Sequence, residues 1–189
     1  VVTMSTYKSL GGPPGGAIVT NDPEIAEKID GIAFPGMTAN FDAAKSAALA
    51  VTMLDWKEFG REYVAEMVLM SKTLASSLEE YDIPIFFGAL GHTQSHQFAV
   101  LAEEYGGGQK ASKLLRKSGF LACGIGLPVQ DIKGDMNGIR FGTPELVKWG
   151  MKAKHSTKLA ELVAKALKGD KVSDQVSKWR RTFNKIHFV

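Results

Sequence analysis

One lysine of the chain, Lys8, stands directly between hydroxyl side chains and a turn rich in glycine and proline. Ser5 and Thr6 precede it, Tyr7 is adjacent, and residues 11–16 form the turn. A lysine amine that has lost its proton can form a Schiff base with an aldehyde cofactor, which requires partial burial or a neighbouring cation. The hydroxyls and free backbone amides of such a loop can hold a phosphate. Taken alone, the local pattern favours a solvent-facing lysine in a Gly/Pro turn.

Short strands and one helix are expected to position the Lys8 loop. Asp22 is the expected N-cap of that helix, because proline and glutamate follow it directly. The expected elements are the end of a buried strand at residues 1–2, a strand at 17–20, a helix at 24–30 and a brief strand at 32–34.

A long helical region is expected over residues 42–81, where apolar side chains recur at near-helical spacing. Gly60 is expected to bend or break this region, and Met67 and Met70 are expected to fill the core. Strands and helices then alternate. The expected strands lie at 98–101, 120–125 and 139–141. The expected helices lie at 109–117, 156–168 and 172–183. A further helix is expected to start at Pro144, with Thr143 as its N-cap.

The segment over residues 5–16 resembles the cofactor-lysine segment of serine hydroxymethyltransferases, which are fold-type-I pyridoxal-phosphate (PLP) enzymes. In that family a Thr/Ser-rich run, an aromatic residue or histidine, the Schiff-base lysine and a Gly-Pro-rich turn follow one another. Three further segments match the family in the same order, whereas one match alone would be weak. They are Phe-Pro-Gly at 34–36, Thr-Gln-Ser-His at 93–96 and Gly-Ile-Arg-Phe-Gly-Thr-Pro at 138–144.

The resemblance implies roles for individual residues. Lys8 would carry PLP and, once freed by substrate, act as an acid or base. Arg140 would clamp the substrate carboxylate, because its planar fork suits a bidentate pair. Tyr7 is a catalytic candidate where many relatives carry histidine, although an unperturbed tyrosine pKa of about 10 limits proton transfer. The expected cofactor-binding residues are Lys8, Ser5, Thr6, Gly36 and Thr38.

The implied architecture is the α/β fold of fold-type-I PLP-dependent transferases, of which this chain would be the C-terminal portion. We expect residues 1–41 to end the large PLP-binding domain, 42–82 to form a long helical connector, and 83–189 to form a small C-terminal α+β domain. In the family most of the large domain precedes the lysine. The expected partners are therefore the N-terminal portion of the same enzyme and a second subunit in a homodimer or higher oligomer.

Composition and charge argue against several other classes of protein. The 189 residues are 44% hydrophobic and 23% charged, which is ordinary for a globular protein, and the net charge of +3 does not indicate a nucleic-acid partner. No apolar run approaches the roughly 20 residues of a membrane helix. The single cysteine, Cys123, fits a reducing compartment, so we expect a cytoplasmic protein.

Two other groups of residues favour structural roles. His92 and His96 lack a further ligand, so no metal site is expected. The basic C-terminal stretch is interpreted as a solvated helix face with one buried tryptophan, Trp179, rather than as an RNA-binding surface.

The expected function is a PLP-dependent enzyme of β-hydroxy-α-amino acid metabolism that makes or breaks the Cα–Cβ bond. Hydroxymethyl transfer, aldolase and transaldolase reactions are variations on this step, within amino-acid and one-carbon metabolism. Residues 131–137 connect Leu127-Pro128 to the expected strand at 139–141, and this connection is short and polar. Tetrahydrofolate-using relatives have a longer connection here. The short connection argues against tetrahydrofolate as a cofactor, although folate dependence stays open. A PLP-dependent aminotransferase and a non-catalytic fragment or subunit stay open as alternatives. A dinucleotide or P-loop protein is excluded by the absence of the glycine motifs.

Overall fold

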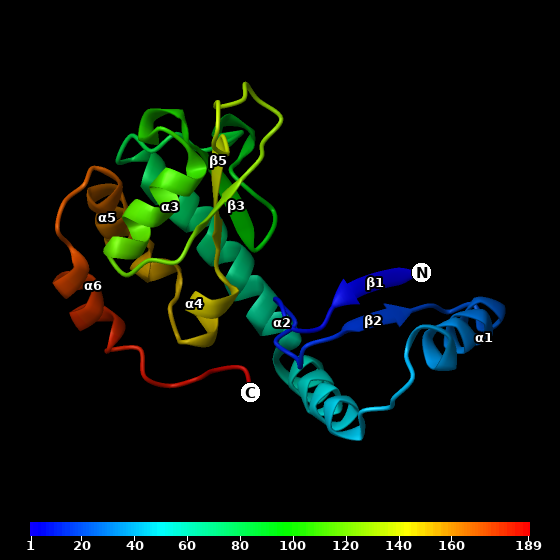
Figure 1. Ribbon diagram of the computed structural model, residues 1–189. Helices are drawn as coiled ribbons and strands as arrows, with labels where there is room; N and C mark the ends of the chain where they lie inside the picture. The colour runs from blue at the N-terminus through cyan, green and yellow to red at the C-terminus, as the bar shows by residue number, and fades with distance from the viewer. The chain divides into compact units, whose positions relative to one another are not determined.

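The computed structural model describes all 189 residues, and the chain divides into two compact units, Val1–Gly60 and Arg61–Phe188 (Figure 1). One helix, α2 (Ala43–Glu79), runs through the division and contributes residues to both units. The units therefore divide inside the predicted helical connector, and the three-part division at residues 41/42 and 82/83 stays a prediction.

The first unit begins with a two-stranded antiparallel hairpin. Strand β1 (Val2–Ser5) pairs with β2 (Gly16–Val19), with Ser5 opposite Gly16, so the residues between them form a closed loop that contains Lys8. The strand predicted at residues 1–2 is present from Val2 as part of β1, but the prediction that it is buried is wrong for this unit. Val1 and Val2 are largely exposed, because the hairpin has no further strand beside it and no buried apolar layer beneath it.

The next element, helix α1 (Pro23–Gly31), starts where the sequence predicted it. The Asp22 carboxylate accepts hydrogen bonds from the amides of Glu24 (2.9 Å) and Ile25 (3.1 Å), which confirms the N-cap. The predicted strand at 32–34 is wrong: the chain continues into a wide helical turn, η1 (Ile32–Met37), which contains a cis peptide bond before Pro35.

Of the bend or break predicted at Gly60, the break is wrong, because helix α2 is continuous there. A β-carbon at Gly60 would come within 2.9 Å of the Trp56 ring, one turn earlier on the helix. The glycine therefore leaves room for the tryptophan, and packing elsewhere on the helix offsets its unfavourable propensity of about 1 kcal/mol. Near the other end of the helix, Met67 and Met70 are buried, as predicted.

A three-stranded antiparallel sheet organises the second unit. Strand β5 (Gly138–Gly142) lies between β3 (Gln97–Leu101) and β4 (Cys123–Ile125). All three strands were predicted, although β4 is shorter than expected. Arg140 lies opposite Ala99 on β3 and Cys123 on β4, so it occupies the centre of the sheet.

Four further helices surround this sheet and, together with α2, supply most of the core. They are α3 (Gly108–Lys117), α4 (Pro144–Lys148), α5 (Ser156–Leu167) and α6 (Ser173–Arg180), with short 3₁₀ turns η2 (Gly88–Leu90), η3 (Glu103–Tyr105) and η4 (Ala153–His155). The predicted helices at 109–117 and 156–168 are confirmed. The terminal helix is shorter than predicted, and Trp179 is half-buried rather than buried, because it lies on a short surface helix. No helix has the length and apolar character needed to span a membrane.

Helix α3 lies against the sheet through glycines. A β-carbon at Gly108 would overlap the carbonyl oxygen of Gly138, and one at Gly124 would come within 2.9 Å of the Gln109 amide nitrogen. A β-carbon at Gly107 would overlap the side chain of Asp135. The first turn of the helix can therefore approach β4 and β5 only where side chains are absent.

The polar connection at 131–137 is engaged within the fold. The Asp135 carboxylate accepts hydrogen bonds from the amides of Gln109 (2.8 Å) and Lys110 (3.2 Å), and so caps α3 from a distant part of the chain. The buried Asn137 side chain bonds to the amide and carbonyl of Leu127. The helix cap and the following loop thus depend on the same connection.

The capping geometry predicts a pH dependence of stability. The Gln109 amide, assisted by those of Met136 and Lys110, holds the pKa of Asp135 below its ordinary 3.8, against an opposing effect of partial burial. The resulting stabilisation is present above pH 3.8 and is lost as the pH falls below it. We expect Asp135→Asn to lower the melting temperature at pH 7, and the difference from wild type to shrink below about pH 4.

The measurement is thermal unfolding across pH 3–7, with Asp131→Asn, a change to an exposed carboxylate of the same connection, as the control. A difference between Asp135→Asn and wild type that stays constant over this range would contradict the capping role of the charge.

Candidate functional site

The loop that carries Lys8 is closed by its own backbone hydrogen bonds. The Thr6 amide donates to the Gly15 carbonyl (3.0 Å), and the Gly12 amide donates to the Thr6 carbonyl (2.8 Å). The Gly11 amide donates to the Lys8 carbonyl (2.8 Å), and Gly11 has a φ of +75°, a conformation that favours glycine. Lys8 therefore begins a tight turn at the end of the hairpin.

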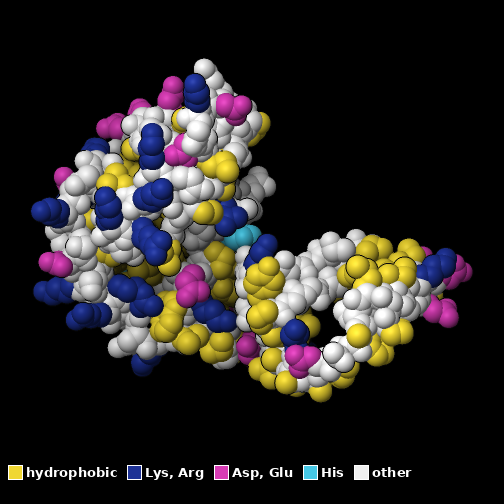
Figure 2. Space-filling model, in the orientation of Figure 1, with side chains coloured by type: hydrophobic (Ala, Val, Ile, Leu, Met, Phe, Trp, Pro, Cys, Tyr) yellow, Lys and Arg dark blue, Asp and Glu magenta, His cyan; other side chains and the backbone are white.

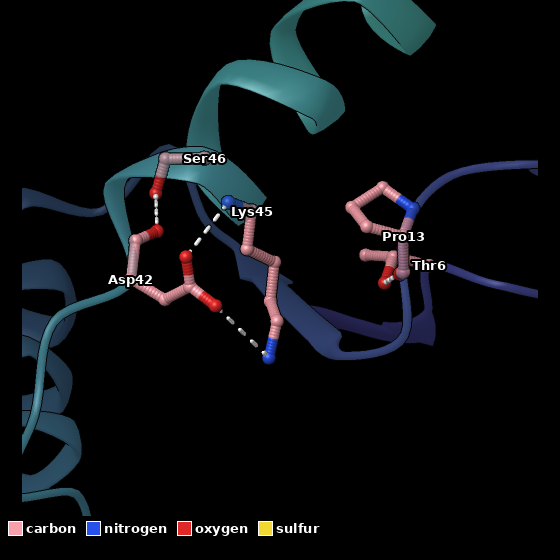
Figure 3. A network of polar contacts seen from close by, with 5 residues as sticks. All are labelled: Thr6, Pro13, Asp42, Lys45 and Ser46. Carbon is pink, nitrogen blue, oxygen red and sulfur yellow. Dashed lines mark hydrogen bonds and ion pairs between the residues drawn. The ribbon is translucent and has the colours of Figure 1, made fainter.

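The hydroxyl side chains before Lys8 differ in their surroundings. Thr6 is buried, and its hydroxyl donates to the carbonyl of Pro13 across the loop (Figure 3). Its hydroxyl therefore helps to close the loop, and its role toward a cofactor stays a prediction. Ser5 is half-buried at the end of β1.

One face of α2 supports the loop. The Trp56 indole nitrogen donates to the Leu10 carbonyl (2.8 Å), and the space around Gly12 is bounded by Leu49 and Thr52. Lys45 lies 3.6 Å from where a β-carbon of Gly15 would be. The supporting helix residues are Lys45, Leu49, Thr52 and Trp56, whose spacing of four, three and four residues places them on a single face.

The start of this supporting helix is capped by Asp42. Its carboxylate accepts from the Lys45 amide (3.0 Å), and its carbonyl accepts from the Ser46 hydroxyl (3.3 Å) (Figure 3). The same carboxylate lies 3.9 Å from the Lys45 amine, in an exposed pair that contributes little by itself. Asp42 therefore fixes the turn of helix that carries Lys45 toward the loop.

Lys8 and Tyr7 themselves are exposed in the first unit. The Lys8 amine lies 5.9 Å from the centre of the Tyr7 ring, near the outer limit of a cation–π contact. The turn thus holds the backbone of Lys8 firmly while its amine remains accessible.

The predicted Phe-Pro-Gly loop forms part of η1. The Thr38 amide (2.9 Å) and the Thr38 hydroxyl (2.6 Å) both donate to the Ala33 carbonyl. A β-carbon at Gly36 would come within 3.1 Å of the Gly31 carbonyl oxygen. Gly36 and Thr38 thus form a compact turn with an exposed surface, and their role toward a cofactor stays a prediction.

Arg140 lies in the second unit, on the open face of the sheet. Ile139 is fully buried and Arg140 exposed, as alternation along a strand requires. Its cross-strand neighbours, Ala99 and Cys123, are small and leave the guanidinium unobstructed. On the other face, Phe141 helps to line a cavity of about 460 Å³ among α4, α5 and α6, and Figure 2 shows hydrophobic side chains in a recess there.

The turn after Arg140 departs from the prediction for Thr143. Thr143 occupies the N-cap position of α4, but its side chain makes no capping hydrogen bond. Its buried hydroxyl lies instead 2.8 Å from the Met67 carbonyl oxygen and 3.1 Å from that of His96. The threonine joins β5 to α2 rather than capping α4.

One of the two histidines pairs with a carboxylate of α2. The His92 Nε2 lies 2.6 Å from a Glu79 carboxylate oxygen, and no group of three or more His, Cys, Asp or Glu residues is placed to hold a metal ion. The segment at 93–96 forms a turn before β3, in which the Thr93 hydroxyl donates to the Gln97 carbonyl (2.7 Å).

The support given by α2 predicts that Trp56→Phe loosens the Lys8 loop. The substitution keeps an aromatic ring against Gly60 but removes the donor to Leu10, which is worth about 0.5–1.5 kcal/mol. We expect faster amide exchange at residues 8–12, measured by hydrogen–deuterium exchange with mass spectrometry. Trp149→Phe, in the second unit, is the matched control, and equal exchange at residues 8–12 in both variants would contradict the anchoring role.

Comparison with known proteins identifies the family. The family model for serine hydroxymethyltransferase matches residues 1–163. Alpha-methylserine aldolases from Ralstonia sp. and Variovorax paradoxus are 54% and 49% identical to the chain; the alignments cover 100% of it and 44% and 43% of those enzymes. Serine hydroxymethyltransferase from Staphylothermus marinus is 35% identical, over 100% of the chain and 44% of that enzyme.

Among solved structures, L-threonine transaldolase from Pseudomonas fluorescens matches with a TM-score of 0.80 and 26% identity, over 96% of this chain and 42% of that one. This likeness confirms the predicted fold-type-I α/β architecture. The chain spans less than half the length of these relatives. With the family model matched over residues 1–163, the resemblance that four short motifs indicated is confirmed, and the chain belongs to the serine hydroxymethyltransferase family.

Proposed function

We propose that this chain is the C-terminal part of a PLP-dependent aldolase that makes or breaks the Cα–Cβ bond of a β-hydroxy-α-amino acid. The observation that carries the proposal is the Lys8 loop, in which an accessible amine is held on a turn closed by three backbone hydrogen bonds. The similarity to alpha-methylserine aldolases, serine hydroxymethyltransferases and a threonine transaldolase supports the reaction class.

The residues of the loop fit PLP. The Lys8 amine is accessible for a covalent bond to the cofactor aldehyde, and the half-buried Ser5 hydroxyl supplies a donor beside it. Thr6 keeps the loop closed through Pro13 and so positions Ser5 and Lys8. We assign Gly36 and Thr38 to the cofactor of a neighbouring subunit, since their turn is exposed in this unit. When bound, PLP supplies the electron sink that makes bonds at Cα labile.

Arg140 holds the substrate carboxylate in this proposal. Its open position between Ala99 and Cys123 allows a bidentate pair, which fixes both the location and the plane of the carboxylate. Tyr7, beside Lys8, can hydrogen-bond to or stack on the bound substrate. The Lys8 amine, once free, can hold or move a proton at the substrate Cα.

Aldol cleavage without folate is favoured over hydroxymethyl transfer. The alpha-methylserine aldolases are 48–54% identical to the chain, whereas the serine hydroxymethyltransferases are 33–35% identical. In the connection at 131–137, the carboxylate of Asp135 and the amide of Asn137 are engaged within the fold. We therefore propose β-hydroxy amino acids with a methyl branch at Cα as substrates, and tetrahydrofolate as unnecessary.

The exposed apolar surface of the first unit is an argument for a further polypeptide as partner. Large apolar side chains are exposed there, and Figure 2 shows hydrophobic side chains across this part of the chain. Contiguous exposed apolar surface of this kind marks an interaction site. We propose that the N-terminal portion of the same enzyme and a second subunit cover it, in a cytoplasmic homodimer or higher oligomer. The exposed residues include Val1, Val2, Ile18, Val19, Ile32, Phe34, Met37 and Phe41.

The cofactor role of Lys8 predicts a specific covalent adduct. Borohydride reduction of the assembled enzyme, in which the N-terminal portion is present, is expected to leave a pyridoxyl group on Lys8, measured by intact mass and peptide mapping. Lys8→Ala should abolish the adduct and lower cleavage of α-methylserine at least 100-fold. Lys57→Ala, at an exposed lysine of the same unit, should change neither.

No adduct in the assembled enzyme would contradict the Schiff-base role of Lys8 and favour the non-catalytic alternative. An adduct together with keto-acid formation, but without aldehyde release, would favour the aminotransferase.

The role of Arg140 predicts a defect in substrate binding. Arg140→Lys keeps the charge but loses the bidentate fork, so we expect KM for the amino acid to rise roughly ten- to a hundredfold, the effect of about 1.5–3 kcal/mol. Arg116→Lys, at an exposed arginine of α3, is the matched control. An unchanged KM in Arg140→Lys would exclude Arg140 from carboxylate binding.

A further inference from the structure

The turn that follows Arg140 is joined to α2 by two hydrogen bonds within the second unit. The Tyr63 hydroxyl donates to the Pro144 carbonyl (3.0 Å), and the Thr143 hydroxyl lies 2.8 Å from the Met67 carbonyl oxygen. Tyr63 and Met67 are one helical turn apart, so both hydrogen bonds are made on the same side of α2. The Thr143 amide also donates to the His96 carbonyl (3.0 Å), which continues the pairing beyond the end of β5.

Both side chains are shielded from water. Thr143 is fully buried, and Tyr63 is only 6% exposed. The Tyr63 ring stacks on Phe188 with a centroid distance of 5.2 Å. Burial, assisted by the nearby charge of Glu145, raises the pKa of Tyr63 to about 12, so its hydroxyl keeps its proton at neutral pH. The hydrogen bond to Pro144 is therefore maintained across the pH range in which such an enzyme works.

These two hydrogen bonds fix the position of the strand on which Arg140 lies. Pairing with β3 and β4 holds the backbone of Arg140 on both sides. The hydrogen bonds at Thr143 and Pro144, three and four residues further along, fix the end of β5. An arginine side chain is long and has many rotamers, so a small rotation of its backbone moves the guanidinium considerably. Binding groups must be held within about 0.5 Å of the productive geometry.

We propose that Tyr63 is a positioning residue that sets the orientation of Arg140 for carboxylate binding, with Thr143 as the second point of the same support. The inference rests on the proposed function, because it concerns the residue assigned there to the substrate carboxylate. Tyr63 acts through the backbone between Pro144 and Arg140 and needs no contact with the substrate.

The substitution Tyr63→Phe tests this role, because it removes one oxygen and keeps the ring that stacks on Phe188. The matched control is Tyr105→Phe, since Tyr105 is a half-buried tyrosine of the second unit whose pKa, like that of Tyr63, is raised to about 12, here by burial and Glu104. Tyr105 lies in η3, away from the turn after β5 in the chain. Both variants are prepared in the assembled enzyme with the N-terminal portion and PLP present.

The first readout is ligand binding, measured by the change in absorbance of the cofactor. Glycine carries a carboxylate, whereas glycinamide keeps the amine and lacks that charge. We expect Tyr63→Phe to weaken glycine binding about two- to tenfold, the worth of one neutral hydrogen bond, and to leave glycinamide binding unchanged. In an Arg140→Ala background, Tyr63→Phe should have no further effect on glycine binding.

The second readout is independent of ligand. Hydrogen–deuterium exchange should be faster across residues 138–147 in Tyr63→Phe than in Tyr105→Phe, because the end of β5 is then less constrained. Equal loss of glycine and glycinamide binding, or an undiminished effect of Tyr63→Phe without Arg140, would overturn the positioning role alone. Absence of both ligands' binding in the unsubstituted holoenzyme would overturn the proposed function, and the inference with it.

Discussion

Hydrogen bonds between α2 and other segments hold the key backbone of each unit. In the first unit the Trp56 indole binds the Leu10 carbonyl, within the turn that begins at Lys8. In the second unit Tyr63 binds the Pro144 carbonyl, and Thr143 binds the helix backbone at Met67. A helix suits this task, because its own backbone bonds are satisfied internally and its side chains are left to bind other segments. The turns that follow Lys8 and Arg140 are thus each supported by the part of α2 that lies in the same unit.

Local patterns in the sequence predicted much of the fold. Asp22 caps α1 as expected, and the periodicity of α5 is confirmed, because such signals involve residues only a few positions apart. The errors occurred where individual side-chain contacts, near or far along the chain, decided the outcome. Gly60 was predicted to bend or break the helix but accommodates the Trp56 ring. Thr143 occupies the predicted N-cap position, but its side chain bonds to a carbonyl 76 residues away.

The candidate site shows the same contrast. The motifs identified Lys8 and Arg140, because those residues stand in short, ordered segments that resemble a known family. They could not identify Trp56 or Tyr63, whose hydrogen-bond partners lie 46 and 81 residues away in the chain. Thr6 was predicted as a cofactor-binding residue, which stays a prediction, and its hydroxyl donates to the Pro13 carbonyl within the loop. A hydroxyl next to Lys8 can thus stabilise the loop itself, and the sequence does not distinguish this role from cofactor binding.

The glycine contact between α3 and the sheet restricts how this part of the chain can evolve. Because a β-carbon at Gly108 would overlap the Gly138 carbonyl oxygen, and one at Gly124 would press on the first turn of α3, no single substitution at either position can be accommodated by rotating a side chain. Relief would require the helix to shift, and with it the Asp135 carboxylate that caps it. Changes here are viable only as concerted sets, so this small region should diverge far more slowly than its exposed surroundings and would tolerate little in a library of random variants.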